Sequence, residues 1–229
     1  MKLSIIIPAY NEASTIGRVI AQIREVDLPG VERVILVVND GSSDRTEEVA
    51  RSTGAVVINH LLNRGVGGAL GTGIEAALRQ GADILVTCDA DGQHSSEDVR
   101  KVMEPVRSGQ ADVVNGSRML AADGMPWTRR IANRVANLVT WVLFGIHMTD
   151  SQSGLRAFSR SAAMQIRIRT NTYEVNSEVC GEIRRHRLRF MEVPIRAIYT
   201  DYSMSKGQGF TMGLKTLIRL ILTKLRAHS

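Results

Sequence analysis

The sequence contains few of the residues that mark several large classes of protein. Only two cysteines, Cys88 and Cys180, occur in 229 residues, which indicates no disulfide framework and fits a reducing compartment. Aromatic residues make up 4% of the chain, and we find no recognition motif for nucleic acid. A module that binds nucleic acid through its basic side chains is therefore disfavoured, and no nucleic-acid partner is predicted.

Long hydrophobic runs are missing as well. No window reaches about 18 uninterrupted apolar residues, so we predict no membrane-spanning helix. The longest candidate, at 135–148, is too short and contains Asn137 and His147. The N-terminal segment has only three consecutive isoleucines before Pro8, so no signal peptide is predicted.

Charge is distributed unevenly along the chain, whose net charge is +6. Residues 1–115 carry 11 basic and 16 acidic side chains, whereas residues 116–229 carry 18 basic and 7 acidic ones. The second half therefore has a net charge of +11. Such a basic half suggests an anionic partner: phosphate groups, nucleic acid or a membrane surface.

The first 115 residues alternate short apolar strands with amphipathic helices. Strands are predicted at 3–7, 31–38, 55–58, 83–88 and 111–115, with helices between them. The helix after residue 44 would be capped by Ser43. This regular alternation predicts an α/β fold with a mostly parallel sheet and helices on both faces. Ligands bind beyond the C-terminal strand ends of such sheets, where residues 8–12, 39–44 and 89–94 lie.

The second half has two amphipathic helices of interest. The first, at 126–145, places apolar residues on one side and arginines and asparagines on the other. The second, at 207–229, places leucines and isoleucines on one face, with Lys215, Arg219 and Arg226 largely off it. We interpret this tail as a helix lying in a membrane surface, the alternative being an ordinary core-packing helix. A polar loop running into a short strand (150–158), a helix (173–186) and a strand (189–195) lie between them.

The stretch TCDADGQH, residues 87–94, ends an apolar strand with two carboxylates. Alternate residues of an extended segment point the same way, so oxygens of Asp89, Asp91 and Gln93 can converge. Carboxylate and amide oxygens suit a hard cation such as Mg²⁺ or Mn²⁺. The alternative is a solvated loop, but the neighbouring polar strand ends favour a site for a metal and a diphosphate.

The glycine-rich segment NRGVGGALGTG, residues 63–73, lacks the Lys-Ser/Thr pair of a Walker A loop. Two interpretations stay open. Its backbone N–H groups could lie near phosphate, or its glycines could serve close packing of a helix on the sheet.

Six segments taken together carry a resemblance to a known family. They are IIIPAYNE (5–12), VVNDGSSDRT (37–46), NRGVGGA (63–69), DADGQH (89–94), GSR (116–118) and SQSGLRAF (151–158). In this order they resemble the glycosyltransferase family 2 domain, and more narrowly the polyprenyl- or dolichyl-phosphate mannosyl- and glucosyltransferases. The resemblance covers about residues 3–206. It implies a GT-A (Rossmann-like) catalytic domain over 1–206, followed by the tail helix over 207–229.

The resemblance also implies roles for single residues. The nucleotide sugar would be bound by Pro8, Ala9, Tyr10, Glu12, Asn39, Asp40, Asp89, Ala90, Asp91 and Lys206. The metal would be held by Asp89, Asp91 and Gln93. The acceptor phosphate would be bound by Arg118, Ser151 and Arg156. Arg130 is a further candidate for the acceptor phosphate because it lies in the basic half, the alternative being a solvated helix face. The catalytic set would be Asp91, Arg118, Gln152, Ser153 and Arg156, and Glu178 matches an acidic helix position of the family.

Four departures from the family pattern bear on function. Asn39 replaces the first Asp of the usual Asp-Asp-Gly, a position that bears on recognition of the base. Val66 replaces a Lys, so one positive charge on the phosphate side is missing. The segment just before Lys206 lacks the usual basic residue and has Ser203 for the usual Gly. Many relatives also carry C-terminal transmembrane helices, whereas a single amphipathic helix is predicted in that part of this chain, at 207–229. A separate membrane subunit is therefore considered as a partner.

The predicted chemistry follows from the acceptor. A phosphate monoester is largely dianionic near neutral pH, with a second pKa of about 6, so it attacks without a strong general base. Arginines suit the phosphate, and a metal stabilises the leaving diphosphate. We predict inverting transfer of a hexose to polyprenyl or dolichyl phosphate at the cytoplasmic face of a membrane. Mannose from GDP-mannose is favoured, with UDP-glucose as the alternative donor. A sugar hydroxyl is the alternative acceptor, with Asp150 as its base.

Overall fold

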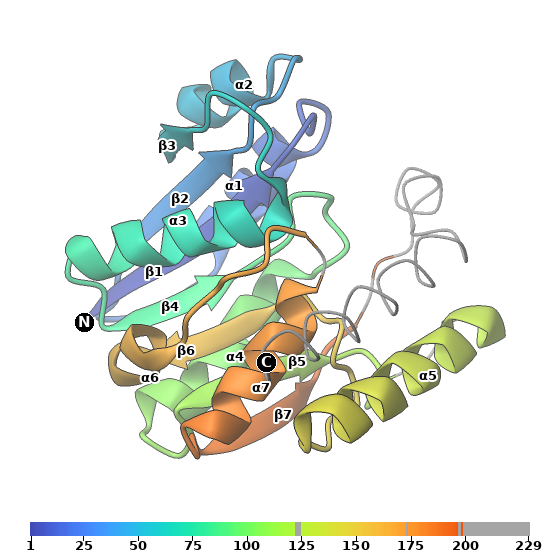
Figure 1. The fold of residues 1–229 in the computed structure, drawn as a ribbon. Coiled ribbons are helices and arrows are strands. Elements are labelled where there is room, and N and C mark those ends of the chain that lie inside the picture. Colours follow the sequence, from blue (N-terminus) through green and yellow to red (C-terminus); the bar gives the residue numbers. More distant parts are fainter. Residues whose placement is uncertain (122–124, 173, 197, 199–229) are drawn as a thin grey trace.

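The computed structural model describes residues 1–121, 125–172, 174–196 and 198 (Figure 1). Its strands are β1 (Lys2–Ala9), β2 (Glu32–Asn39), β3 (Val56–Asn59), β4 (Ile84–Thr87), β5 (Val113–Ser117), β6 (Arg156–Ser159) and β7 (Phe190–Pro194). Its helices are α1 (Ile16–Glu25), α2 (Thr46–Ser52), α3 (Gly65–Arg79), α4 (Ser96–Arg107), α5 (Trp127–Phe144), α6 (Arg160–Gln165) and α7 (Val175–Arg185). The predicted Lys206 and the predicted tail domain at 207–229 lie outside the described residues.

The seven strands form one sheet in the order β3-β2-β1-β4-β6-β5-β7. The pairs β1–β2, β1–β4, β2–β3 and β5–β7 are parallel, and β6 pairs antiparallel with both β4 and β5. The predicted mostly parallel α/β fold is therefore confirmed. The direction of β6 was not predicted, nor was the short helix α6.

Helices cover both faces of the sheet, as predicted. Figure 1 shows α3, α6 and α7 on the near face and α1 and α4 on the far face. The strands feed both layers because successive side chains point to opposite sides. Ile5 and Ile7 belong to the apolar cluster on the side of α1 and α4, whereas Ile6 belongs to the cluster on the side of α3 and α7. The buried Cys88 packs in the first cluster, as its apolar run predicts.

The glycines of α3 serve close packing. A Cβ at Gly73 would clash with Ile6 of β1, and one at Gly65 or Gly67 would clash with the backbone at 170–171. The N–H of Gly67 donates to the carbonyl of Asn171 at 2.9 Å. Of the two open interpretations of the glycine-rich segment, the structure supports packing.

The predicted cap of α2 is wrong. The helix begins at Thr46, too far along the chain for Ser43 to cap it. The residue before the helix is Arg45, whose side chain makes no cap bond, and the Asp44 carboxylate accepts the Thr46 N–H at 3.0 Å. Within the described residues, no helix combines the length and the apolar character that crossing a membrane requires.

Candidate active site

Polar segments converge at one edge of the sheet, where β1, β2 and β4 end. The backbone N–H of Asp40 donates to the carbonyl of Ala9 at 2.8 Å, and that of Cys88 donates to the carbonyl of Ile6 at 3.0 Å. The turns after these three parallel strands are therefore locked side by side. This arrangement brings the predicted nucleotide residues of 8–12 and 39–40 next to Asp89, Ala90 and Asp91.

The two carboxylates after β4 have opposed pKa shifts. Burial and the charge of Asp89 raise the pKa of Asp91. Burial would also raise the pKa of Asp89, but the hydrogen bond from His94 and the positive charges of Arg118 and Arg156 hold it below its usual range. The pair therefore places like charges together, and a bound cation would relieve their repulsion.

This donor set fits Mg²⁺ or Mn²⁺. Among the described residues, no three His, Cys, Asp or Glu side chains form a group that could hold a metal on their own. Mg²⁺ is commonly bound through one or two carboxylates and completed by substrate phosphates and water. Asp89 and Asp91 supply that number of carboxylates. An ion bound there would stabilise the negative charge that develops on a leaving diphosphate.

Gln93 lies against Asp91 as a hydrogen-bond donor. Its side-chain Nε2 donates to Asp91 Oδ2 at 2.7 Å, and its backbone N–H donates to Oδ1 at 3.0 Å. Gln93 thus orients the Asp91 carboxylate. A direct bond from the Gln93 amide oxygen to a metal stays a prediction.

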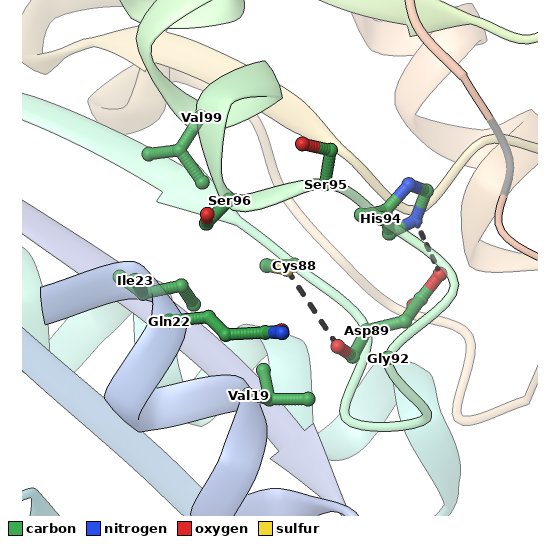
Figure 2. A pocket seen from close by; sticks show the side chains of 10 residues that line it. All are labelled: Val19, Gln22, Ile23, Cys88, Asp89, Gly92, His94, Ser95, Ser96 and Val99. Carbon is green, nitrogen blue, oxygen red and sulfur yellow. Dashed lines mark hydrogen bonds and ion pairs between the residues drawn. The ribbon is translucent and has the colours of Figure 1, made fainter. Parts of the chain in front are cut away.

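Two neighbours to which the sequence analysis assigned no role fix the position of Asp89. The imidazole of His94, whose side chain is only 3% exposed, places Nε2 3.1 Å from Asp89 Oδ2. Figure 2 shows this contact beside a small hollow that α1 closes with Val19 and Gln22. On the other side, a Cβ at Gly154 would collide with both Asp89 carboxyl oxygens. Asp89 therefore lies between a buried ring and a glycine, and any larger residue at position 154 would have to displace the Asp89 carboxylate.

Asp40 is tied into the wall of the site. Its carboxylate accepts the backbone N–H groups of Arg64 and Gly65 at 2.9 and 2.7 Å, and Oδ1 lies 2.6 Å from His60 Nδ1. The other ring nitrogen of His60 lies 2.9 Å from Thr72 Oγ1. Asp40 thus anchors the start of α3, and its predicted contact with the nucleotide would be additional to this role.

Within the described residues, the other predicted nucleotide residues lie at the ends of β1 and β2 and in the turn after β1. The Asn39 amide donates to Asn59 Oδ1 at 3.0 Å, and the side chain is 5% exposed. The backbone N–H of Glu12 donates to the Thr46 hydroxyl at 2.8 Å, which joins the turn after β1 to the start of α2. Tyr10 is 48% exposed at the rim, so its ring is available to a base.

On the opposite side of the site, Arg118 and Asp150 form a bidentate ion pair. Arg118 Nε lies 2.7 Å from Asp150 Oδ2, and Nη2 lies 2.8 Å from Oδ1. Asp150 is fully buried, and Oδ2 also accepts the Arg118 backbone N–H at 3.0 Å. Glu192 of β7 supports the same loop by accepting the Thr149 N–H at 2.8 Å. The pair commits the Asp150 carboxylate to holding Arg118.

Arg156 lies beneath this loop. It is 2% exposed, and three of its nitrogens donate to neutral acceptors: Asn115 Oδ1, Asn176 Oδ1 and the carbonyl of Ser151. The geometry favours a role in positioning the loop over the predicted direct contact with phosphate. Its charge still acts across the site, since it lowers the pKa of Asp89.

The remaining predicted residues are either buried in the loop or partly accessible. Ser151 and Ser153 are buried in the loop, Gln152 is half-buried, and Arg130 is half-buried on α5. Glu178 does not face the site. Its carboxylate accepts the N–H groups of Arg169 and Thr170, and so supports the segment that packs on the start of α3.

Comparisons with known proteins agree with this architecture. Residues 4–167 match the model of Glycosyl transferase family 2. The chain is 43% identical to uncharacterized protein MJ1222 of Methanocaldococcus jannaschii, covering 98% of this chain and 93% of the relative. It is 37% identical to the UDP-N-acetylglucosamine--dolichyl-phosphate N-acetylglucosaminyltransferase of Methanococcus voltae (96% and 95% covered). It is 31% identical to the undecaprenyl-phosphate mannosyltransferase of Micrococcus luteus (93% and 90% covered).

Solved structures share the fold. Glucosyl-3-phosphoglycerate synthase from Mycobacterium tuberculosis, in complex with phosphoglyceric acid, superposes with a TM-score of 0.76 at 22% identity, covering 98% of this chain and 79% of that one. The same enzyme in complex with Mn²⁺, UDP and glucosyl-3-phosphoglycerate gives a TM-score of 0.73 at 20% identity, covering 97% and 79%. The match over residues 4–167 and the similarity to these relatives show that the chain belongs to glycosyl transferase family 2.

Proposed function

We propose that the protein transfers a sugar from a nucleotide-diphosphate sugar to the phosphate of a polyprenyl or dolichyl phosphate. The observation that carries this proposal is the ion pair between Asp150 and Arg118. The best candidate for a general base is fully buried and bidentately bound to an arginine. An acceptor hydroxyl needs such a base, whereas an acceptor phosphate does not, because it already carries the attacking charge.

Arg118 is the group we assign to the acceptor. Its side chain is 18% exposed, so the guanidinium is fixed by Asp150 and still reaches the surface of the site. Pre-positioning an arginine lowers the entropic cost of binding phosphate. The names of the relatives from Methanococcus voltae and Micrococcus luteus, which act on dolichyl and undecaprenyl phosphate, support the same acceptor class.

The donor side is assigned to Asp89 and Asp91, with the diphosphate reached through Mg²⁺ or Mn²⁺. Gln93, His94 and Gly154 hold the two carboxylates in place. Tyr10 and Asn39 line the position of the base. The acceptor oxygen would attack the anomeric carbon opposite the diphosphate, with inversion of configuration.

The identity of the sugar follows less directly from the chain. GDP-mannose remains our prediction from the motifs, with UDP-sugars as competitors. The relative that is 37% identical is named for UDP-N-acetylglucosamine, and the one that is 31% identical is named for mannose. The experiment therefore compares GDP-mannose, UDP-glucose and UDP-N-acetylglucosamine as donors. The cytoplasmic membrane face and the separate membrane subunit also stay predictions.

The test incubates the purified full chain with Mn²⁺ or Mg²⁺, a short polyprenyl phosphate in detergent, and radiolabelled GDP-mannose, UDP-glucose or UDP-N-acetylglucosamine. We expect label in the organic phase with one donor, and none after EDTA or with the unphosphorylated polyprenol. Label transferred to polyprenol or to an added sugar hydroxyl would contradict the phosphate acceptor. Arg118→Lys, which keeps the charge and loses the bidentate pair, should raise the KM for acceptor more than that for donor.

A further inference from the structure

The helix α5 packs with its polar side inward. The Asn137 amide donates to the carbonyl of Thr149 at 2.5 Å, and its Oδ1 accepts the Ser151 N–H at 2.8 Å. Thr140 is the one buried residue of the helix, and it lies 3.3 Å from the Ser151 hydroxyl. The inner side of α5 therefore holds the loop that carries Asp150 and Ser151.

The apolar side of α5 faces away from the protein. Its large apolar residues recur every three or four positions and are all at least half exposed. They are Trp127 (72%), Ile131 (50%), Val135 (51%), Leu138 (55%), Trp141 (52%) and Val142 (67%). Figure 1 shows the helix along the outer edge of the molecule. A helix of 18 residues is about 27 Å long, so this stripe, which we call the α5 face, is far larger than the scattered apolar residues of a normal surface.

The charge of α5 selects the kind of partner. The helix contains Arg129, Arg130 and Arg134 and no acidic residue. Arg134 is exposed and, at helical spacing, lies between Trp127 and Leu138. A second copy of the chain docked on the same face would bring Arg134 of both copies to one interface across a two-fold axis, which disfavours self-association. A partner with an apolar interior and an anionic surface would match both the apolar stripe of α5 and its positive charge.

The two tryptophans sharpen that choice. They are the only tryptophans in the chain, and both lie on the α5 face, near its two ends. Tryptophan is enriched where an apolar layer meets water, because its ring is apolar and its N–H is polar. Arginine can bury its stem in such a layer and keep its charge at the headgroups.

We propose that the α5 face docks on an anionic lipid surface. Docking would place one side of a single helix in the lipid boundary while the other side holds the loop of Asp150 and Ser151. The choice of lipid over a protein partner rests in part on the proposed lipid-phosphate acceptor. The docking itself needs neither donor nor acceptor, so the two proposals can fail separately.

The chain's own tryptophans make the direct probe. The full chain and the single-tryptophan variants W127F and W141F are mixed with vesicles of phosphatidylcholine containing or lacking phosphatidylglycerol. We expect emission to shift to the blue and brominated lipids to quench it in both variants, on anionic vesicles and less at high salt. Binding to vesicles with unmoved, unquenched tryptophan would overturn the proposal, because another segment would then be the anchor. A blue shift that grows with protein concentration without vesicles would overturn it in favour of a second copy.

A substitution tests the same face independently of the probe. Leu138→Glu puts an acidic group at the centre of the stripe and should weaken vesicle binding at least about tenfold, the cost of removing one buried leucine. Met164→Glu, at a 65% exposed apolar residue on α6, is the matched control and should bind as wild type does. Both variants should transfer sugar to a detergent-dispersed short acceptor at the wild-type rate. Equal vesicle binding by L138E and wild type would contradict the docking proposal. Absence of sugar transfer by the wild type itself would count against the proposed function and leave the docking proposal standing.

Discussion

The two sides of the candidate site are organised by different forces. The donor side is formed by turns after β1, β2 and β4, and parallel strands place these turns side by side. The acceptor side depends on buried polar contacts between distant segments, such as Arg118 with Asp150 and Glu192 with Thr149. The regular pairing of parallel strands therefore positions the donor side, whereas buried ion pairs and hydrogen bonds position the acceptor side. Mutations should expose this difference.

Removing a donor-side carboxylate should have the largest effect on activity. Asp91→Asn keeps the shape of the side chain and removes the charge that a metal requires. We expect transfer to fall by roughly 10²–10³, the size seen when one group that stabilises a developing charge is lost. Glu97→Gln, at an exposed residue of α4, is the control. Rates and Mn²⁺ binding are measured together, and full activity of the Asp91 variant with intact fold would remove the metal from the proposal.

Breaking the acceptor-side ion pair should give a smaller and different effect. Asp150→Asn leaves Arg118 partly buried without its bidentate partner, which should cost about 2–3 kcal/mol of unfolding free energy. We expect the KM for lipid phosphate to rise about tenfold or more, with donor binding unchanged. Calorimetry and steady-state kinetics with each substrate varied make the measurement. If Asp150 were a general base, kcat would collapse and the acidic limb of its pH profile, where the base is protonated, would disappear.

The placement of the donor-side segments could be predicted from the sequence, whereas the contacts of the acceptor side could not. Apolar runs such as Ile5 to Ile7 locate strands, and the residues that follow them must then lie at the sheet edge. The pairing of Asp150 with Arg118 gives no local pattern, because 32 positions separate the two residues. The same holds for Arg156, whose residue type suggested phosphate and whose burial points to support of the loop.

Tertiary pairing also explains what the sequence could not show about the fold. The strand β6 has four residues, and its antiparallel direction is set by its neighbours β4 and β5 and not by its composition. His94 follows the two carboxylates in the sequence, but only the structure shows that its ring lies on Asp89. Gly154 is the signal that sequence reasoning missed, since a glycine inside a polar motif often marks a close approach.

Gly154 of the acceptor-side loop lies against Asp89 of the donor side, so a substitution there shows how far one side depends on the other. Gly154→Ala puts a methyl group into the position of the Asp89 carboxylate. We expect Mn²⁺ affinity to fall about tenfold, comparable to the loss of a supporting contact around a metal ligand. In Gly71→Ala, the matched control on α3, the new Cβ meets only Ile168, at 3.9 Å. Unchanged metal affinity in the Gly154 variant would show that Asp89 has room to move.

The two sides should also differ in their pH dependence. Burial and the charge of Asp89 raise the pKa of Asp91, and a divalent cation binds only the ionised carboxylate. Metal affinity should therefore be constant above the raised pKa of Asp91 and fall by up to about tenfold per pH unit below it. The arginines of the acceptor side stay charged, so binding of lipid phosphate should follow only the second pKa of the phosphate itself, about 6.

Electron paramagnetic resonance of Mn²⁺ between about pH 4 and pH 8 gives the metal affinity without turnover, and this window spans the ordinary carboxylate range. Asp91→Asn should flatten the profile, since Asp89 has its pKa lowered and stays ionised through most of that window. A wild-type affinity that stays level or rises as the pH falls would mean that Asp91 does not bind the ion. The difference between the two sides would then lie in their scaffolding alone, and the charge that receives the diphosphate would have to come from elsewhere in the basic half.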